Sequence, residues 1–235
     1  MKSKEDFLQM LLDKGALRME SNSDKFFTFK SGRRSPNMIN MRALTDGESL
    51  SAIKRAYAQK IKELLDNGKI EDFDFIFGPA YAGISLACLA CEGLFEMGIN
   101  KRYLYDRKEA KGYGDVKMDD LVVGAGHFFP GARILIVDDV ITTGATKEDA
   151  LKKLASLGEQ KIVGLVLAVD RQEKLGDATN VEEKSATEKL EESGIKVFPI
   201  LTMQEIYAMV KEYMPDMDNM HWIEYYEKYG AVKLD

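Results

Sequence analysis

Apolar residues along the chain fall into two alternating patterns. Two short runs, residues 134–137 and 162–169, are almost wholly apolar, as expected for strands of a parallel sheet buried on both faces. Residues 72–77, which end in Phe75-Ile76-Phe77, are a third predicted strand. Segments between them carry apolar residues at helical spacing, which predicts amphipathic helices; they begin near residues 48, 84 and 146. This alternation predicts an α/β fold, with a twisted, mainly parallel sheet covered by helices on both faces.

Local signals refine the predicted elements. Residues 102–105 form a short strand, and residues 195–201 resemble an edge strand because Pro199 lacks a backbone N–H. Thr45 and Thr202 each precede a glutamate by three positions, the pattern of a capping box, so each is predicted to begin a helix. The polar stretch 175–189 is expected to be a solvated insertion that leads into a short helix.

The amino-terminal segment departs from the strand and helix alternation. Phe7, Leu8 and Leu11 lie on one side of a predicted helix that ends at Gly15. Residues 26–40 begin as a strand and then turn twice, at Ser-Gly and Ser-Pro pairs. We expect residues 1–45 to form a small hood within a single domain of residues 1–235, because one core suffices for a chain of this length.

The apolar run 134–137 ends in two adjacent carboxylates, Asp138 and Asp139. A turn of small residues follows and opens the next helix: Thr142, Thr143, Gly144, Ala145 and Thr146. Backbone N–H groups and threonine hydroxyls at such a turn can hold a phosphate beyond the strand end. Because carboxylates repel phosphate, the two acids should face sugar hydroxyls or a hydrated Mg²⁺ ion. The pattern favours a sugar-phosphate site over two acids that merely cap the helix.

Three other loops follow predicted strands. The loop G-P-A-Y-A-G, residues 78–83, has glycines that suit either close approach to a ligand or a tight connection. Residues 106–115 carry three cations and few apolar anchors, so we expect an anion to order them, although many charged runs are plain solvated loops. Arg171 could grip a carboxylate bidentately, or pair with Asp170 or Glu173.

Composition narrows the class of ligand. The chain has 33 basic and 39 acidic residues and a formal charge of -6, which disfavours a nucleic-acid partner. Positive charge is nevertheless expected to gather near the predicted site, which suits a small polyanionic substrate; the cations are Lys30, Arg33, Arg34, Arg107, Lys108, Lys111 and Arg171. No apolar run is long enough to cross a membrane, and no signal-peptide core follows Met1, so we expect a cytoplasmic protein without membrane contact.

Several familiar motifs fail on their details. Cys88 and Cys91 form a C-x-x-C pair without a second pair, inside an apolar helix, so we predict buried structural thiols and not a zinc or redox site. Gly124-Ala125-Gly126 precedes a strand instead of following one, and no G-x-x-x-x-G-K-[ST] loop is present. Dinucleotide and P-loop nucleotide binding are therefore disfavoured.

Four separated motifs resemble those of orotate phosphoribosyltransferases, type I phosphoribosyltransferases, in the same order. They are K-S-G-R-R-S-P from Lys30, G-P-A-Y-A-G from Gly78, R-K-E-A-K from Arg107 and V-D-D-V-I-T-T-G from Val137. The resemblance covers almost the whole chain. It implies the type I phosphoribosyltransferase fold and the substrates orotate and 5-phosphoribosyl 1-pyrophosphate.

The resemblance also implies roles for individual residues. Residues 142–146 are expected to hold the 5'-phosphate, Asp138 and Asp139 the ribose hydroxyls, and Arg171 the orotate carboxylate. Lys108 and Lys111 are the expected catalytic cations. Further substrate contacts are expected from Lys30, Tyr81 and Arg107. Mg²⁺ is the expected cofactor, bound mainly through substrate and water near the two acids.

The resemblance further implies a homodimer in which residues 107–115 close over the neighbouring site. Two other functions stay open at this stage: transfer to a different nucleobase, and regulation by a chain that binds the donor without chemistry. Met38, Ala82 and Tyr113 keep them open, because these residues differ from the ones common at those positions in the family.

Overall fold

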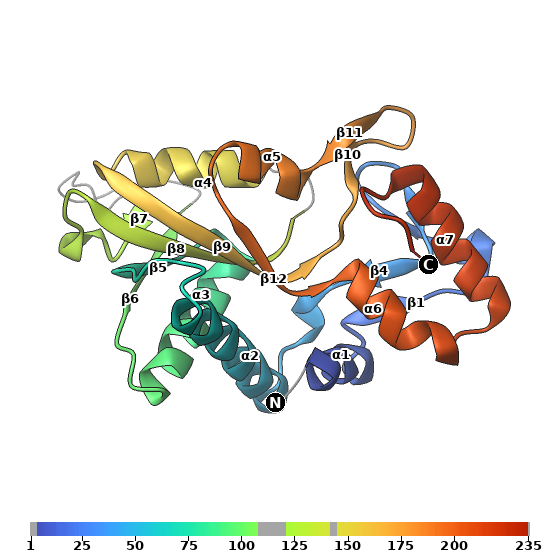
Figure 1. Cartoon of the computed structure of the whole chain (residues 1–235), viewed down its shortest axis with the longest axis horizontal. Helices are drawn as coiled ribbons and strands as arrows, with labels where there is room; N and C mark the ends of the chain where they lie inside the picture. Colours follow the sequence, from blue (N-terminus) through green and yellow to red (C-terminus); the bar gives the residue numbers. More distant parts are fainter. Residues whose placement is uncertain (1–3, 108–120, 142–144, 235) are drawn as a thin grey trace.

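The computed structural model describes residues 4–107, 121–141 and 145–234, with the backbone alone for 145–149. Its centre is a sheet of six strands in the order β12-β9-β8-β5-β6-β7 (Figure 1). The strands are β5 (Phe75–Gly78), β6 (Arg102–Asp106), β7 (Val122–Val123), β8 (Ala132–Val140), β9 (Gln160–Asp170) and β12 (Val197–Thr202). All neighbouring strands are parallel except β6 and β7. The predicted fold class is confirmed.

Successive residues of the central strands enter different cores, because side chains of a strand alternate between its faces. Ile76, Leu135 and Val166 belong to one core, whereas their neighbours Phe75, Ile134 and Leu165 belong to the other. Helices α2 (Gly47–Asp66) and α3 (Ala82–Glu96) cover the first face, and α4 (Ala145–Ala155) and α5 (Ala186–Glu192) lie over the second (Figure 1). The continuous apolar runs of the sequence follow from this two-sided burial.

Strand β12 lies at the edge of the sheet, as Pro199 predicted. It pairs with β9 alone among the described strands, with Pro199 opposite Leu167. Thr202 then caps α6 (Met203–Val210) with the predicted capping box. The expected box at Thr45 is wrong by one position, because Asp46 is the N-cap of α2 and accepts a hydrogen bond from the Ser49 N–H at 2.9 Å.

The amino-terminal segment forms small elements beside the main sheet. They are α1 (Lys4–Asp13), β1 (Leu17–Met19), the 3-10 turns η1 (Ser23–Lys25) and η2 (Met41–Ala43), β2 (Phe27–Thr28), β3 (Arg34–Ser35) and β4 (Asn37–Ile39). Strands β1 and β4 pair antiparallel, and β2 and β3 form a hairpin. Together they make the expected hood.

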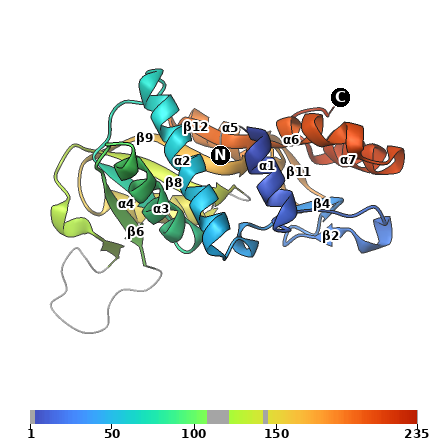
Figure 2. The same cartoon turned by 90° about the horizontal axis from the view of Figure 1, so that it is seen from below.

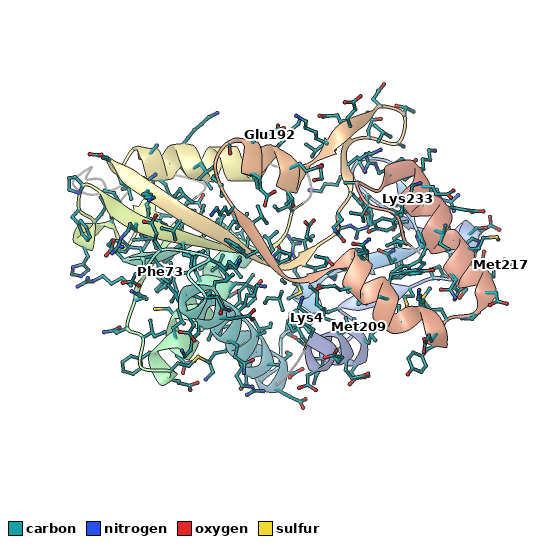
Figure 3. The ribbon with its side chains drawn as sticks, viewed as in Figure 1. Lys4, Phe73, Glu192, Met209, Met217 and Lys233 are labelled. Atoms are coloured by element: carbon teal, nitrogen blue, oxygen red, sulfur yellow. The ribbon has the colours of Figure 1, made fainter. Side chains whose placement is uncertain are left out.

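The carboxyl-terminal helices join this hood, which the sequence did not predict. Helices α6 and α7 (Asp216–Tyr229) lie beside α1, β1 and β4 and away from α2 and α3 (Figures 1 and 2). Lys4 of α1 pairs with Glu205 of α6, and Phe7 shares a core with Trp222 of α7 (Figure 3 labels Lys4). The aromatic tail therefore packs against its own chain.

The insertion 175–189 is more ordered than expected. Strands β10 (Lys174–Gly176) and β11 (Val181–Ser185) form an antiparallel hairpin before α5. The Asp177 carboxylate accepts hydrogen bonds from the N–H groups of Thr179 and Asn180, each at 2.7 Å, and these bonds hold the turn. Backbone pairing outweighs the polar composition here.

The prediction of two buried thiols is wrong. Cys88 is exposed, and Cys91 is half-buried with its thiol donating to the Lys101 carbonyl at 2.8 Å. Helix α3 packs against α2 and the sheet through residues such as Leu86, Ala87 and Ala90, and Cys88 lies outside that face.

None of the helices in the described parts of the chain is both long and apolar enough to span a membrane.

Candidate active site

The strands that precede the predicted site loops all end on the same side of the molecule. Strands β5, β6, β8 and β9 are parallel neighbours, so their carboxyl ends meet there. They end at Gly78, Asp106, Val140 and Asp170. These four strand ends are thereby brought together from distant parts of the chain.

Asp138 and Asp139 lie at the carboxyl end of β8, just before its last residue, and both are partly exposed. The Asp138 carboxylate accepts a hydrogen bond from the Asp139 N–H at 2.9 Å, and the Asp139 carboxylate accepts one from the Val140 N–H at 2.7 Å. From Val137 onward β8 pairs with β9 but no longer with β5 among the described residues. The two acids therefore stand at a half-open strand end where a ligand can reach them.

Tyr57 supports this strand end from α2. Its hydroxyl donates to the backbone carbonyl of Asp138 at 2.8 Å, and its side chain is fully buried. Burial raises the pKa of Tyr57 well above its ordinary value of 10, and the nearby charges of Asp139 and Asp138 add to this effect. The hydroxyl thus stays protonated and remains a donor to the strand that carries both acids.

The loop 78–83 packs tightly against itself. A Cβ on Gly78 would lie 2.0 Å from the Gly83 carbonyl oxygen, and a Cβ on Gly83 would lie 2.7 Å from Pro79. Both glycines are therefore required by the tight connection between β5 and α3. Tyr81, at the start of α3, leaves 68% of its surface exposed.

Arg171 lies just beyond β9 and is buried, with 7% of its surface exposed. Its Nε donates to Glu173 Oε1 at 2.9 Å, and its Nη2 lies 3.5 Å from Ser35 Oγ. Burial disfavours the charge, but the Glu173 carboxylate, together with Tyr226 and Tyr225, holds the pKa of Arg171 above its ordinary value. The alternative in which Arg171 pairs with a neighbouring acid is thus present in the structure.

Arg33 has a structural role that the sequence did not reveal. Its guanidinium is 3% exposed and donates to the carbonyls of Lys174, Leu175 and Asp177 at 2.7, 2.9 and 3.2 Å. It also lies 3.6 Å from the Glu173 carboxylate. Arg33 therefore binds backbone carbonyls and lies beside Glu173, the partner of Arg171.

The hairpin that carries Lys30 lies against Arg171. Phe29 is the residue before Lys30, and its ring centroid lies 4.5 Å from the Arg171 guanidinium carbon. Ser35, at the end of the same hairpin, approaches Arg171 as well. Lys30 itself is exposed. The hood therefore delivers an exposed cation next to the end of β9.

Comparison with known proteins decides the family. The family model for the phosphoribosyl transferase domain matches residues 42–200. Orotate phosphoribosyltransferase of Neurospora crassa is 38% identical over an alignment 237 residues long, which covers 97% of this chain and 97% of the relative. The chain belongs to the orotate phosphoribosyltransferase family.

Other relatives agree with this membership. Orotate phosphoribosyltransferase of Bifidobacterium adolescentis is 38% identical over 86% of this chain and 83% of the relative. The crystal structure of the orotate phosphoribosyltransferase of Francisella tularensis has a TM-score of 0.77 and 30% identity, and the match covers 96% of this chain and 99% of that one. The similarity thus includes the hood and the carboxyl-terminal helices.

Part of the predicted orotate phosphoribosyltransferase site lies outside the described residues. This holds for Lys108, Lys111, Thr142, Thr143 and Gly144. Ala145 and Thr146 begin α4, and only their backbone is described. Arg107 follows β6 directly and is half-buried, with its N–H donating to the Leu121 carbonyl at 2.8 Å.

Local sequence pattern does not reveal the roles of two positions near this site. Tyr57 falls at an apolar position of the predicted helix that begins near residue 48, and Asp106 opens the charged run 106–115. The structure puts Asp106 inside β6 and buries it to 4% exposure. An acid directly after the apolar residues of a predicted strand was the only signal available for it.

Proposed function

We propose that this protein transfers the phosphoribosyl group from 5-phosphoribosyl 1-pyrophosphate to N1 of orotate. The products are orotidine 5'-monophosphate and pyrophosphate, and the reaction belongs to de novo pyrimidine biosynthesis. Family membership supports the reaction. The observation that carries it in the structure is the pair of carboxylates at the end of β8, beside the buried cation that follows β9.

In this proposal the strand-end acids hold the ribose. Asp138 and Asp139 accept hydrogen bonds from its vicinal hydroxyls, while the turn 142–146 binds the 5'-phosphate with backbone N–H groups and threonine hydroxyls. Helix α4 begins at Ala145, so its positive end adds to the attraction for phosphate. These contacts fix C1 of the ribose for attack.

The chemical step is a substitution at that carbon. The N1 electron pair of orotate forms the bond to C1, and the C1–O bond breaks so that pyrophosphate leaves with its electron pair. The N1 proton goes to solvent, or orotate arrives already ionised, so we assign no general base. Lys108 and Lys111 are proposed to neutralise the charge that builds on the departing pyrophosphate.

Mg²⁺ is the proposed cofactor. Among the described residues, no group of three or more His, Cys, Asp or Glu is arranged to hold a metal ion. Two partly exposed carboxylates suit an ion that keeps much of its water and takes oxygens from the substrate. When bound there, Mg²⁺ would screen the charge of the pyrophosphate.

Arg171 and Lys30 are proposed to recognise orotate. Arg171 keeps its charge in a buried position, and a guanidinium binds a carboxylate through two parallel hydrogen bonds. Its Nε and Nη2 already donate to Glu173, and Nη2 also lies near Ser35, so two parallel hydrogen bonds to orotate would require its carboxylate to replace one of these partners. Lys30, Tyr81 and Arg107 are proposed as further substrate contacts.

We also propose a homodimer in which residues 107–115 serve the partner's site. One observation supports an interface on α3: Cys88 and Phe95 are exposed and lie seven residues apart, so they share one face of the helix. Tyr103 of β6 lies near this face. Burial raises the pKa of Tyr103, and the nearby Cys88 thiol adds to this effect. A cytoplasmic location is proposed, where charged, water-soluble substrates reach the enzyme.

A spectrophotometric assay tests the reaction. Purified protein is mixed with orotate, the donor and Mg²⁺, and loss of orotate absorbance is followed together with pyrophosphate release. We expect both signals in equal amounts, and loss of most turnover in Asp139→Asn, whose amide holds hydroxyls and hydrated metal less well. Turnover with another base alone would assign a different acceptor. Donor binding by calorimetry without pyrophosphate release for any base would identify a non-catalytic protein.

A further inference from the structure

A buried ion pair joins β6 to α4. Lys153 Nζ lies 3.0 Å from Asp106 Oδ2, and the two side chains are 12% and 5% exposed. The other carboxylate oxygen, Oδ1, accepts a hydrogen bond from the Ala80 N–H at 2.6 Å. Buried charges are costly unless they are paired and hydrogen-bonded, and here one carboxylate binds groups from two different segments.

Lys153 makes a second contact at the same place. Its ammonium group donates to the Arg107 carbonyl at 3.0 Å. Three segments therefore converge on these two side chains: the loop 78–83 through Ala80, the residue that opens segment 107–115, and helix α4, which follows the turn 142–146. In the proposed function, Tyr81 and Arg107 contact substrate, and the turn 142–146 holds the 5'-phosphate of the donor.

The contacts lie where the pairing between β5 and β6 stops, while Asp106 still pairs with Val122 of β7. The ladder between β5 and β6 ends at Gly78 and Tyr105, and Asp106 is the next residue. Beyond the last paired residues, the Asp106 carboxylate holds the Ala80 N–H, the first peptide group after Pro79. Because Gly78 and Gly83 pack directly on each other, a constraint on Ala80 also constrains the rest of this short loop.

We propose that Asp106 and Lys153 are positioning residues that set the donor-binding loops relative to one another. Neither side chain touches the substrates in this proposal, which rests on the proposed phosphoribosyl transfer. The pair acts through the Ala80 N–H and the Arg107 carbonyl. Displacing a substrate-holding group by about 1 Å can cost a hundredfold in rate, so a small shift in these loops should be measurable.

Lys153→Met is the first test, with Lys152→Met as its matched control. Lys152 is the exposed neighbour on the same helix, so its variant removes an equal charge without touching the pair. Per folded enzyme, Lys153→Met should lower kcat/KM for the donor by about tenfold or more, with orotate KM changed less than about twofold. Lys152→Met should retain wild-type values. A purely structural role would lower only the folded fraction and leave both KM values unchanged.

The double variant Asp106→Asn/Lys153→Met separates positioning from charge burial. It removes both buried charges together, so its thermal midpoint should recover from that of Lys153→Met. The contact with the Arg107 carbonyl stays absent, so donor kcat/KM should stay low. Wild-type donor kcat/KM in either variant, per folded enzyme, would overturn the inference. An inactive wild-type protein would instead reject the proposed function.

Discussion

At the scale of single residues, Tyr57 shows how a site side chain depends on a distant helix. Its hydroxyl reaches from α2 to the Asp138 carbonyl at the end of β8. Tyr226 of α7 does the same for the neighbouring strand, where its hydroxyl donates to the Arg171 carbonyl at 2.7 Å. Two buried tyrosines thus hold the backbone at two adjacent points of the candidate site.

Removing the Tyr57 hydroxyl should loosen the carboxylate pair. Tyr57→Phe keeps the buried ring but leaves the Asp138 carbonyl without this donor, so we expect a loss of about 0.5–1.5 kcal/mol in the free energy of unfolding. We also expect donor kcat/KM to fall several-fold. Urea unfolding and steady-state kinetics measure the two effects. Tyr207→Phe is the control, because Tyr207 is a buried tyrosine that stacks on Trp222 of α7; equal kinetic losses in both variants would contradict the role of Tyr57.

The environment of Arg171 changes how its role should be tested. Arg171→Ala would remove the proposed substrate contact and also a buried partner of Glu173, so lost binding would be mixed with lost stability. Arg171→Lys keeps the charge but loses the planar fork that binds carboxylates. We expect orotate KM to rise about tenfold or more, with donor KM nearly unchanged.

Arg133→Lys serves as the control for this substitution. Arg133 lies near the amino end of β8, at the opposite end of the strand from the candidate site, so its variant should leave both KM values unchanged. A normal orotate KM in Arg171→Lys combined with weaker donor binding would assign Arg171 to the phosphates.

At the scale of elements, α2 owes its start to a charged cap. The Asp46 carboxylate accepts from the Ser49 N–H and pairs with Lys14 of the hood at 3.1 Å. The hydrogen bond from Ser49 is the largest cause that lowers the pKa of Asp46, followed by Lys14. Asp46 therefore caps the start of α2 and also links this helix to the hood.

This cap predicts part of the acid sensitivity of the fold. Because the folded-state pKa of Asp46 is lowered, its contribution is complete above the unfolded value near 4 and is lost as the pH falls toward the folded value. Asp46→Asn keeps a good N-cap that does not titrate. We expect a smaller drop in urea midpoint between pH 6 and pH 3 in Asp46→Asn than in the wild type. An identical drop in both proteins would exclude Asp46 as a source of the pH dependence.

At the scale of the whole molecule, the shared loop makes a prediction about subunit mixing. Lys111→Ala and Asp139→Asn should each be inactive. If Lys111 acts in trans, a mixed dimer has one doubly damaged site and one intact site. Random pairing of equal amounts makes half of the dimers mixed, so about a quarter of wild-type activity should return. Orotate consumption after subunit exchange measures it.

Exchange itself must be shown separately, by capture of a tagged subunit with its untagged partner. Confirmed exchange without recovered activity would mean that Lys111 serves its own subunit.

A companion variant, Phe95→Glu, puts a charge on the exposed apolar face of α3, and light scattering should then report monomers. Unchanged dimers in that variant would move the interface elsewhere.

The sequence by itself determined the sheet, its edge strand and the family. Unbroken apolar runs report burial on both faces, and Pro199 reports an edge, because these constraints act on each strand locally. The motifs at the strand ends identified the ligand class for the same reason, since phosphate and sugar groups need particular residue types close together in the chain.

Only the tertiary structure decided which polar groups meet across the chain. The contacts of Tyr57 with Asp138, Arg33 with the 174–177 hairpin, and Lys153 with Asp106 join residues separated by 81, 141 and 47 positions. No local pattern encodes such pairs, because each depends on how strands and helices pack and on which charges that packing buries. For the same reason Arg33 and Arg171, alike in sequence as cations, have different surroundings: one is bound to backbone carbonyls, and the other stands at the end of β9 beside the hairpin that carries Lys30.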